Sequence, residues 1–218
     1  MKTNKTVCHP LFARFFTKIA TKGEALGVSQ HRDELLKNLK GKLVEIGAGT
    51  GLNFSHYPDS VTKVIAVEPE PYLRAQAVKQ AAYTKTSIQV VGGVGQALPF
   101  EDEVFDAAVA SLVLCSVSSQ ENTLKEILRV LKPGGELAFY EHVLAENSTL
   151  SYIQHSVDLF WPTFGGGCHT SRDTIGAIEK AGFSNISYRR FVFRPCFLML
   201  PVSPLVIGRA VKDKILGP

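Results

Sequence analysis

Residues 43–51, with the sequence Leu-Val-Glu-Ile-Gly-Ala-Gly-Thr-Gly, constrain the fold more than any other part of the chain. An apolar strand containing one acid runs directly into three glycines at alternate positions. Glycines at the end of a strand allow a tight turn and let the backbone approach a ligand closely, because no Cβ intervenes. The stretch therefore predicts the first strand of an α/β fold with a ligand at its carboxyl end.

A second acid stands at the end of the next predicted strand, where residues 64–69 are Val-Ile-Ala-Val-Glu-Pro. Glu68 follows Gly47 by about 20 residues, the spacing at which the second parallel strand presents a carboxylate to ribose hydroxyls. Together, the glycine stretch and Glu68 predict that the chain binds a cofactor containing adenosine.

Two kinds of adenosine cofactor compete for a glycine-rich turn after the first strand. Dinucleotides use the spacing G-x-G-x-x-G and place a pyrophosphate at a helix N-terminus, whereas the glycines here follow G-x-G-x-G. Glu45 lies two residues before the first glycine, and a carboxylate there favours a cationic ligand over a pyrophosphate. S-adenosylmethionine carries a sulfonium and an ammonium group and no phosphate, so the pattern favours this cofactor.

Strands and helices alternate along the rest of the chain, which predicts the α/β class: a doubly wound, mostly parallel sheet with helices on both faces. Seven strands are predicted, over 43–47, 63–67, 88–92, 104–111, 136–143, 184–193 and 205–212. Helices are predicted over 52–56, 70–83, 119–131, 149–160 and 171–181. Pro195, Pro201 and Pro204 predict a loop before the last strand, because proline does not fit a central strand.

Residues 1–40 are predicted to form an N-terminal helical cap or lid on a core of residues 41–218, within a single domain 1–218. The predicted helix over 10–21 has its apolar side chains on one face, and a second helix is predicted over 30–39. Three roles stay open for the first helix: packing on the core, covering the cofactor, and peripheral contact with a membrane surface.

Composition excludes several classes of function. The formal net charge of +4 is spread along 218 residues, so no basic block predicts nucleic-acid binding. The four cysteines are far apart, which is typical of reduced thiols in a cytoplasmic protein. Cys168-His169 lacks the further ligands of a zinc site, so no metal is expected. No signal peptide or bilayer-spanning stretch is predicted, and the oligomeric state stays open.

Several motifs stand in the order in which one enzyme family has them. The glycine stretch matches the family's first motif, and Val67-Glu68-Pro69 matches the second. The later landmarks are Leu98-Pro99-Phe100, Phe105-Asp106, the stretch 128–135 and Ala181-Gly182-Phe183. By these motifs the sequence resembles the class I S-adenosylmethionine-dependent methyltransferases. The resemblance implies a Rossmann-like fold and methyl transfer from S-adenosylmethionine to a small-molecule acceptor.

A narrower resemblance, to the methyltransferase-like thiol S-methyltransferases, rests on stretches 111–117, 141–143, 167–168, 170–172 and 200–204. It implies an apolar thiol as the acceptor. The animal members carry an N-terminal apolar anchor that this sequence lacks, so stable membrane insertion is not expected, whereas peripheral surface contact stays open. Two alternatives stay open: N- or O-methylation of a lipid headgroup, quinone precursor or other metabolite, and a non-catalytic module that binds S-adenosylmethionine.

The family resemblance also assigns cofactor contacts. It implies that Glu45 and the glycine turn hold the methionine portion, that Glu68 accepts both ribose hydroxyls, and that Pro69 lies against the adenine. An Asp binds the adenine amino group in many members; Val94 stands there, so an acceptor at 96–97 is the expected substitute. The expected cofactor residues are Glu45, Gly47, Ala48, Gly49, Gly51, Asn53, Glu68, Pro69, Gln96, Ala97, Ser111 and Leu112.

Methyl transfer mainly requires that the nucleophile be aligned with the methyl carbon and that water be excluded. A thiol, with a pKa of about 8.5, needs only modest help to ionise. His142 lies at the carboxyl end of the fifth predicted strand and is the predicted base, with a structural hydrogen bond as the alternative. Asp158 is the second predicted catalytic group. The predicted acceptor-binding residues are Tyr57, Trp161, His169 and Arg172.

Overall fold

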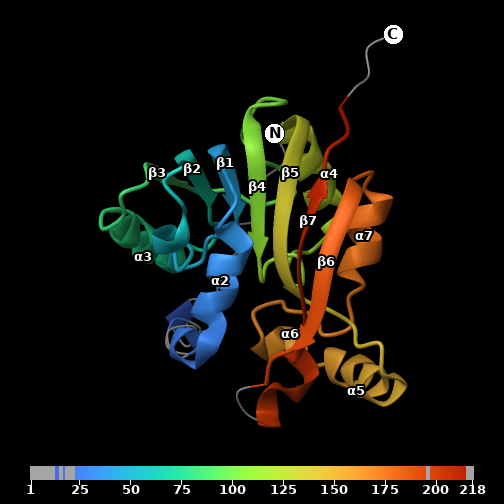
Figure 1. Ribbon diagram of the computed structural model, residues 1–218. Helices are drawn as coiled ribbons and strands as arrows, with labels where there is room; N and C mark the ends of the chain where they lie inside the picture. Colours follow the sequence, from blue (N-terminus) through green and yellow to red (C-terminus); the bar gives the residue numbers. More distant parts are fainter. Residues whose placement is uncertain (1–12, 15–16, 18–22, 195–196, 215–218) are drawn as a thin grey trace.

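The protein is built on one seven-stranded sheet with helices on both faces (Figure 1). A computed structural model describes residues 13, 14, 17, 23–194 and 197–214. The strands are β1 (Gly41–Ile46), β2 (Val61–Val67), β3 (Ile88–Val91), β4 (Phe105–Ser111), β5 (Leu131–His142), β6 (Ser184–Val192) and β7 (Pro204–Val211).

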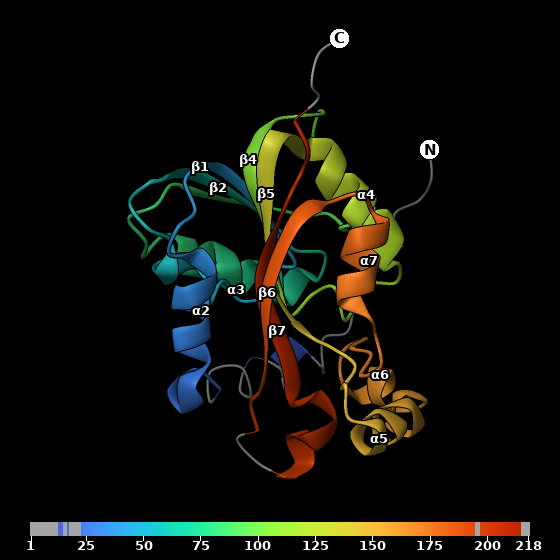
Figure 2. The ribbon, with the colours of Figure 1, turned by 45° about the vertical axis from the view of Figure 1, so that its right-hand side comes forward.

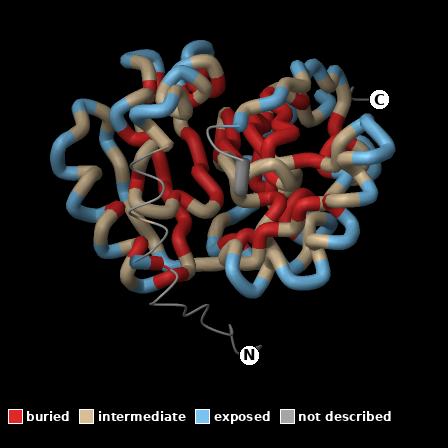
Figure 3. The backbone as a smooth tube through the Cα atoms, turned by 90° about the horizontal axis from the view of Figure 1, so that it is seen from below, coloured by how far each residue is buried: buried red, intermediate tan, exposed pale blue. Residues whose placement is uncertain are grey.

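The strand order is β3-β2-β1-β4-β5-β7-β6. Neighbours pair in parallel from β3 to β5, whereas β7 runs antiparallel to both β5 and β6. The expected doubly wound, mostly parallel α/β sheet is therefore confirmed. Its parallel strands all end at the lower edge in Figure 1, and Figure 3 looks onto that edge. In open sheets of this kind ligands bind at the carboxyl edge.

Helices cover both faces of the sheet. The α-helices are α2 (Ser29–Leu36), α3 (Pro71–Ala81), α4 (Gln120–Val130), α5 (Ser148–Asp158), α6 (Trp161–Phe164) and α7 (Thr174–Lys180), and the short helical turns are η1 (Glu24–Val28), η2 (Phe54–His56) and η3 (Phe197–Val202). Figure 2 shows α2 on one side of the sheet and α4 and α7 on the other. None of the helices in these described ranges is long and apolar enough to cross a bilayer.

The two cores follow the alternation of side chains along the strands. Val44 and Ile46 of β1 pack with α4 and α7, whereas Leu43 packs on the other face with α2 and α3. Because alternate residues of a strand point to opposite faces, one apolar run serves both cores. The predicted N-terminal cap is present as α2, whose Leu35 and Leu36 are buried against the sheet. The predicted helix over 10–21 lies largely outside the described residues.

Most predicted elements are present within a few residues. The main departures are β5, which begins at Leu131 instead of residue 136, and the region after residue 160. The expected loop around the prolines contains the helical turn η3, and Pro204 begins β7. A proline is tolerated as the first residue of a strand, so the expectation of a loop up to 204 was wrong there. The short helix α6, which starts at Trp161 with Pro162 in its first turn, was not predicted.

Candidate functional site

The glycine turn after β1 has the backbone conformation that its spacing predicted. Gly47, Gly49 and Gly51 have φ angles of 66°, 57° and 85°, a region that residues with a Cβ rarely adopt. A Cβ on Gly47 would lie 2.4 Å from Val113 Cγ2, at the end of β4. The turn therefore depends on glycine both for its conformation and for its close approach to the neighbouring strand.

A buried polar network surrounds Glu45 at the start of this turn. Asn53 Nδ2 donates to Glu45 Oε1 at 2.8 Å, and the Tyr57 hydroxyl donates to Oε2 at 2.7 Å. Burial raises the pKa of Glu45, and these two hydrogen bonds together with the nearby Arg32 partly offset the rise. We expected Tyr57 to line the acceptor pocket; instead, the structure places its hydroxyl on Glu45, in the cofactor part of the site.

Arg32 of α2 reaches into the same network from the cap. Its Nη1 donates to Asn53 Oδ1 at 2.6 Å and lies 3.4 Å from Ser111 Oγ, while Nε pairs with Glu24 at 3.0 Å. Sequence analysis missed Arg32, because an arginine in a cap helix carries no motif. With Glu45, it provides one cation and one anion, a set that fits the carboxylate and ammonium of a methionine group.

These groups line a cavity of about 70 Å³ at the carboxyl ends of β1 and β4. Its lining residues are Arg32, Glu45, Gly47, Ala48, Gly49, Thr50, Leu52, Asn53, Ser111 and Leu112. The structure thus brings together most of the residues expected at the methionine end. Leu112 has a positive φ of 56° at this point, a strained conformation of the kind that collects at ligand sites.

Glu68 lies at the end of β2, where it links that strand to the glycine turn. Its Oε2 accepts from the Gly49 amide at 2.8 Å, and its Oε1 accepts from the Glu70 amide at 2.9 Å. Burial raises the pKa of Glu68 to about 7, and the two amides oppose this shift. Each carboxylate oxygen keeps a further lone pair, so the group suits two ribose hydroxyls. Pro69 follows directly, half-buried.

The adenine end of the expected site contains a small turn. The Ala97 amide donates to the Val94 carbonyl at 3.1 Å, and Gln96 Nε2 donates to Ser118 Oγ at 2.7 Å. The Ala97 carbonyl and the Gln96 amide oxygen are acceptors at this turn. An adenine amino group requires an acceptor, so either group would complement it.

A buried carboxylate from β5 holds the loop that follows β4. Glu141 accepts from the amides of Val113, Leu114 and Cys115 at 2.9, 2.8 and 3.1 Å. Burial raises the pKa of Glu141 to about 7 although these hydrogen bonds favour the ionised form. The loop between β4 and α4 is thereby fixed at the carboxyl edge, between the cofactor cavity and the residues predicted for the acceptor.

His142 lies at the end of β5 with one ring nitrogen already used. Its Nδ1 donates to the Val202 carbonyl at 2.7 Å. Burial lowers the pKa of His142 to about 4, and this hydrogen bond only partly offsets the shift. A neutral imidazole with so low a pKa is a weak base for a thiol. Its predicted catalytic role stays a prediction, and the geometry favours the structural alternative.

The other residues predicted for the acceptor gather in the segment from α5 to residue 172. His169 Nδ1 pairs with Asp158 Oδ2 at 2.9 Å. Arg172 Nη1 donates to the Leu114 carbonyl at 2.7 Å, which ties this segment to the β4–α4 loop. Trp161 packs against a buried cluster of Cys115, Cys168 and Val202. Across the described ranges, no three His, Cys, Asp or Glu side chains gather as metal ligands would.

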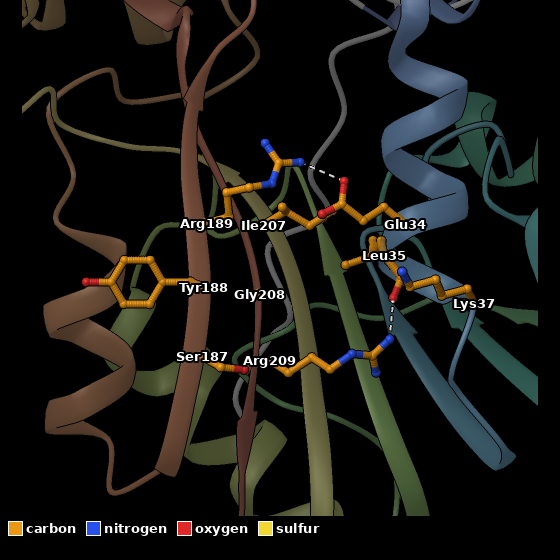
Figure 4. A pocket seen from close by; sticks show the side chains of 9 residues that line it. All are labelled: Glu34, Leu35, Lys37, Ser187, Tyr188, Arg189, Ile207, Gly208 and Arg209. Atoms are coloured by element: carbon orange, nitrogen blue, oxygen red, sulfur yellow. Dashed lines mark hydrogen bonds and ion pairs between the residues drawn. The ribbon is translucent and has the colours of Figure 1, made fainter.

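A larger cavity, of about 320 Å³, lies beside the middle of β6 and β7 (Figure 4). Three of its charged lining residues are in ion pairs: Arg189 with Glu34 at 2.7 Å, and Arg209 with Glu136 at 2.9 Å. This cavity lies along the strands rather than at the carboxyl edge, and none of the predicted site residues lines it. We therefore assign the functional site to the smaller cavity.

Comparisons with known proteins point to one family. Residues 44–139 match the family model described as a methyltransferase domain. The chain is 37% identical to thiol S-methyltransferase TMT1B of Rattus norvegicus over 93% of this chain and 83% of that protein. It is 34% identical to thiol S-methyltransferase TMT1A of Homo sapiens over 94% of this chain and 88% of that protein. A demethylmenaquinone methyltransferase of Thermobifida fusca, 35% identical, matches 46% of the chain.

Solved structures share the fold at lower identity. A methyltransferase from Thermotoga maritima superposes with a TM-score of 0.65 and 24% identity, over 93% of this chain and all of that chain. The [4+2]-cyclase SpnF superposes with a TM-score of 0.68 and 21% identity, over 86% of this chain and 80% of that chain. At these identities the superpositions establish the fold alone, which different reactions share.

Proposed function

Because the chain belongs to the methyltransferase family that includes thiol S-methyltransferases TMT1A and TMT1B, we propose that it methylates a small apolar thiol. The cofactor of this enzyme is S-adenosylmethionine, as the methyltransferase domain indicates. The observation that supports the thiol proposal is the share of the chain that each group of relatives matches. The thiol S-methyltransferases match 93–94% of the chain, including the acceptor segments, whereas the Thermobifida menaquinone relative matches 46%.

The residues of the cofactor cavity fit this cofactor chemically. We propose that Arg32 pairs with its carboxylate, that Glu45 attracts its ammonium and sulfonium charges, and that Glu68 accepts the ribose hydroxyls. When bound, the cofactor supplies a methyl group on a positively charged sulfur. The chain itself orients the two ends, since the glycine turn and the Glu141-bound loop are both fixed by backbone hydrogen bonds.

The acceptor half contributes an apolar surface and proton transfer. Trp161 and the buried cluster beside it, Cys115, Cys168 and Val202, provide apolar packing next to the loop that follows β4. An apolar surround excludes water, which otherwise solvates a thiolate and weakens it as a nucleophile. The proposed acceptor is therefore a thiol with an alkyl or aryl body rather than a highly polar one.

A product assay tests the thiol proposal. The purified protein is incubated with trideuteromethyl-labelled S-adenosylmethionine and a panel of alkyl and aryl thiols, phenols and amines. We expect labelled thioethers and an equal amount of S-adenosylhomocysteine from the thiols. Labelled ethers or methylamines without thioethers would instead support O- or N-methylation, and no product from any thiol would contradict the proposal.

A second candidate, methylation of a lipid-side metabolite, is favoured by the exposed apolar residues around α6. Leu159, Phe160 and Phe164 are exposed beside the predicted acceptor segment. We propose that this rim makes peripheral contact with membranes, as exposed apolar clusters do. Co-sedimentation with anionic liposomes tests it: Phe160→Ser with Phe164→Ser should reduce binding, and an intact protein that never sediments would contradict membrane contact.

A further inference from the structure

Asp158 and His169 form a carboxylate–imidazole pair outside the cofactor cavity. Asp158 Oδ2 accepts from His169 Nδ1 at 2.9 Å, and Oδ1 accepts from the Thr170 amide and from the Thr170 hydroxyl at 3.2 Å. Burial opposes ionisation of Asp158, but the hydrogen bonds from His169 and Thr170 outweigh it and hold the pKa of Asp158 below its usual value. The pair therefore consists of an ionised carboxylate and an imidazole that donates from Nδ1.

This arrangement leaves Nε2 of His169 as the acceptor nitrogen. A carboxylate on Nδ1 both fixes the tautomer and stabilises the imidazolium that forms when Nε2 takes a proton. The His169 side chain is 37% exposed, and Nδ1 is the ring nitrogen used by Asp158. His142 lacks the carboxylate partner, and its imidazole is buried. Its Nδ1 donates to a neutral carbonyl, and burial lowers its pKa to about 4.

The backbone places His169 at the carboxyl edge. The His169 amide donates to the Cys115 carbonyl at 2.8 Å. Cys115 follows Leu112, a residue of the cofactor cavity, by three positions, and Glu141 holds its amide. The same short loop therefore lines the cofactor cavity at one end and holds the backbone of His169 at the other.

We propose that His169 is the general base that deprotonates the acceptor thiol, with Asp158 as its positioning residue. This inference rests on the proposed thiol acceptor. The thiol proton first passes to His169 Nε2, and the sulfur of the resulting thiolate then forms a bond to the methyl carbon. The bond from that carbon to the sulfonium breaks, and its electron pair stays on the departing sulfur. The imidazolium then loses its proton to solvent, so the products are a thioether, S-adenosylhomocysteine and one proton.

The test compares two thiols in the wild type and in His169→Gln. An alkyl thiol is mostly protonated at neutral pH and requires a base, whereas an aryl thiol is largely ionised and does not. For the alkyl thiol we expect transfer to slow by about 100-fold, within the usual contribution of a general base. Transfer to the aryl thiol and the calorimetric affinity for the cofactor should stay close to wild type. Raising the pH should restore much of the loss with the alkyl thiol.

Two further variants separate a chemical role from a structural one. Asp158→Asn keeps the side-chain shape but presents an amide donor to Nδ1, which reverses the tautomer and should slow the alkyl thiol selectively. His155 is an exposed histidine on α5, the helix that also carries Asp158. His155→Gln is therefore the matched control and should change neither transfer rate. Thermal unfolding of each variant shows whether the fold is intact. If His169→Gln fails to fold, Asp158→Asn provides the same test, because it too should slow transfer to the alkyl thiol and not to the aryl thiol.

A direct measurement of thiol ionisation keeps this inference distinct from the proposed function. Ultraviolet absorbance reports thiolate formation when an alkyl thiol binds to the protein with S-adenosylhomocysteine. We expect a thiolate signal at neutral pH in the wild type that His169→Gln abolishes. The pH profile of this signal also reflects the titratable neighbours Asp158, Arg172, Cys115 and Cys168.

The outcomes fall into distinct groups. Equal slowing of both thiols, or of neither, would overturn the assignment of His169 as base. If the wild type forms no thioether with either thiol, the proposed function is wrong. If the wild type also gives no thiolate signal, the assignment of His169 as base is wrong as well. A wild-type signal that His169→Gln abolishes would support the base even with a different methyl acceptor.

Discussion

The cofactor half and the acceptor half of the site are built in different ways. The cofactor half comes from the ends of β1, β2 and β4, and its main hydrogen bonds join strand ends and turns, such as Glu68 to the Gly49 amide. The acceptor half depends on segments that meet only in the folded chain, as His142 meets the Val202 carbonyl 60 residues away. The first half is fixed mainly by sheet register, to which α2 adds Arg32, and the second is fixed by side chains and loops.

This difference determines where substitutions act. In the cofactor half, Glu68 accepts from the Gly49 amide and is also the proposed acceptor for the ribose hydroxyls, so its loss should remove a turn anchor and a ligand contact together. In the acceptor half, the backbone of residues 167–172 is held by several independent bonds, from Arg172 to Leu114 and from His169 to Cys115. Substitutions of single side chains there should change chemistry more than binding.

The largest expected effect on binding is that of Glu68→Ala. The variant loses the acceptor for two hydroxyls and the bond to the Gly49 amide. Because hydrogen bonds to a charged group contribute about 1.5–3 kcal/mol each, cofactor affinity should fall by roughly 100-fold or more. Calorimetry with S-adenosylmethionine measures it, with the exposed Glu101→Ala as control. Unchanged affinity would remove Glu68 from the cofactor site.

Arg32→Met should have the next largest effect. Methionine keeps much of the apolar stem but removes the cation that reaches Asn53 in the cavity. Loss of one charge-assisted contact predicts a decrease in cofactor affinity of roughly tenfold. A cofactor analogue that lacks the carboxylate should bind the wild type and Arg32→Met with equal affinity. If Arg32→Met still binds the cofactor more tightly than this analogue by the wild-type ratio, Arg32 does not pair with the carboxylate.

Cofactor affinity should also depend on pH through Glu68. Its pKa of about 7 means that the carboxyl group gains a proton as the pH falls below neutrality. Since the ribose hydroxyls require the ionised form, affinity should weaken by less than about tenfold between pH 7.5 and pH 6, with proton release on binding. Calorimetry in buffers of different ionisation enthalpy measures the released protons, and uptake instead of release would contradict this assignment.

His142→Gln should have the smallest effect. Glutamine keeps a donor for the Val202 carbonyl, and a histidine with a pKa of about 4 contributes little to thiol ionisation. We expect transfer to change by less than about tenfold, below the usual contribution of a general base. A loss as large as that expected for His169→Gln would assign the base to His142 instead.

Sequence patterns predicted most of the residues that line the cavity at the ends of β1 and β4, because these residues lie in contiguous motifs whose geometry follows from strand ends. The glycine spacing and the two acids required no knowledge of distant contacts. Arg32 was not predicted, because only the packing of α2 on the sheet brings it beside Asn53. In the acceptor half, the residue types were predicted but not their pairing. No rule of sequence spacing predicts the hydrogen bond between Asp158 and His169 or that between Tyr57 and Glu45, because both depend on the geometry of loops.

The independence of the two halves can be measured in one crossed experiment. Cofactor affinity and single-turnover transfer to an alkyl thiol at saturating cofactor are determined for Glu68→Ala and His169→Gln. We predict that Glu68→Ala loses affinity, whereas His169→Gln keeps wild-type affinity and loses transfer rate. A His169→Gln variant that loses cofactor affinity as strongly as transfer rate would contradict the division of the site into two halves.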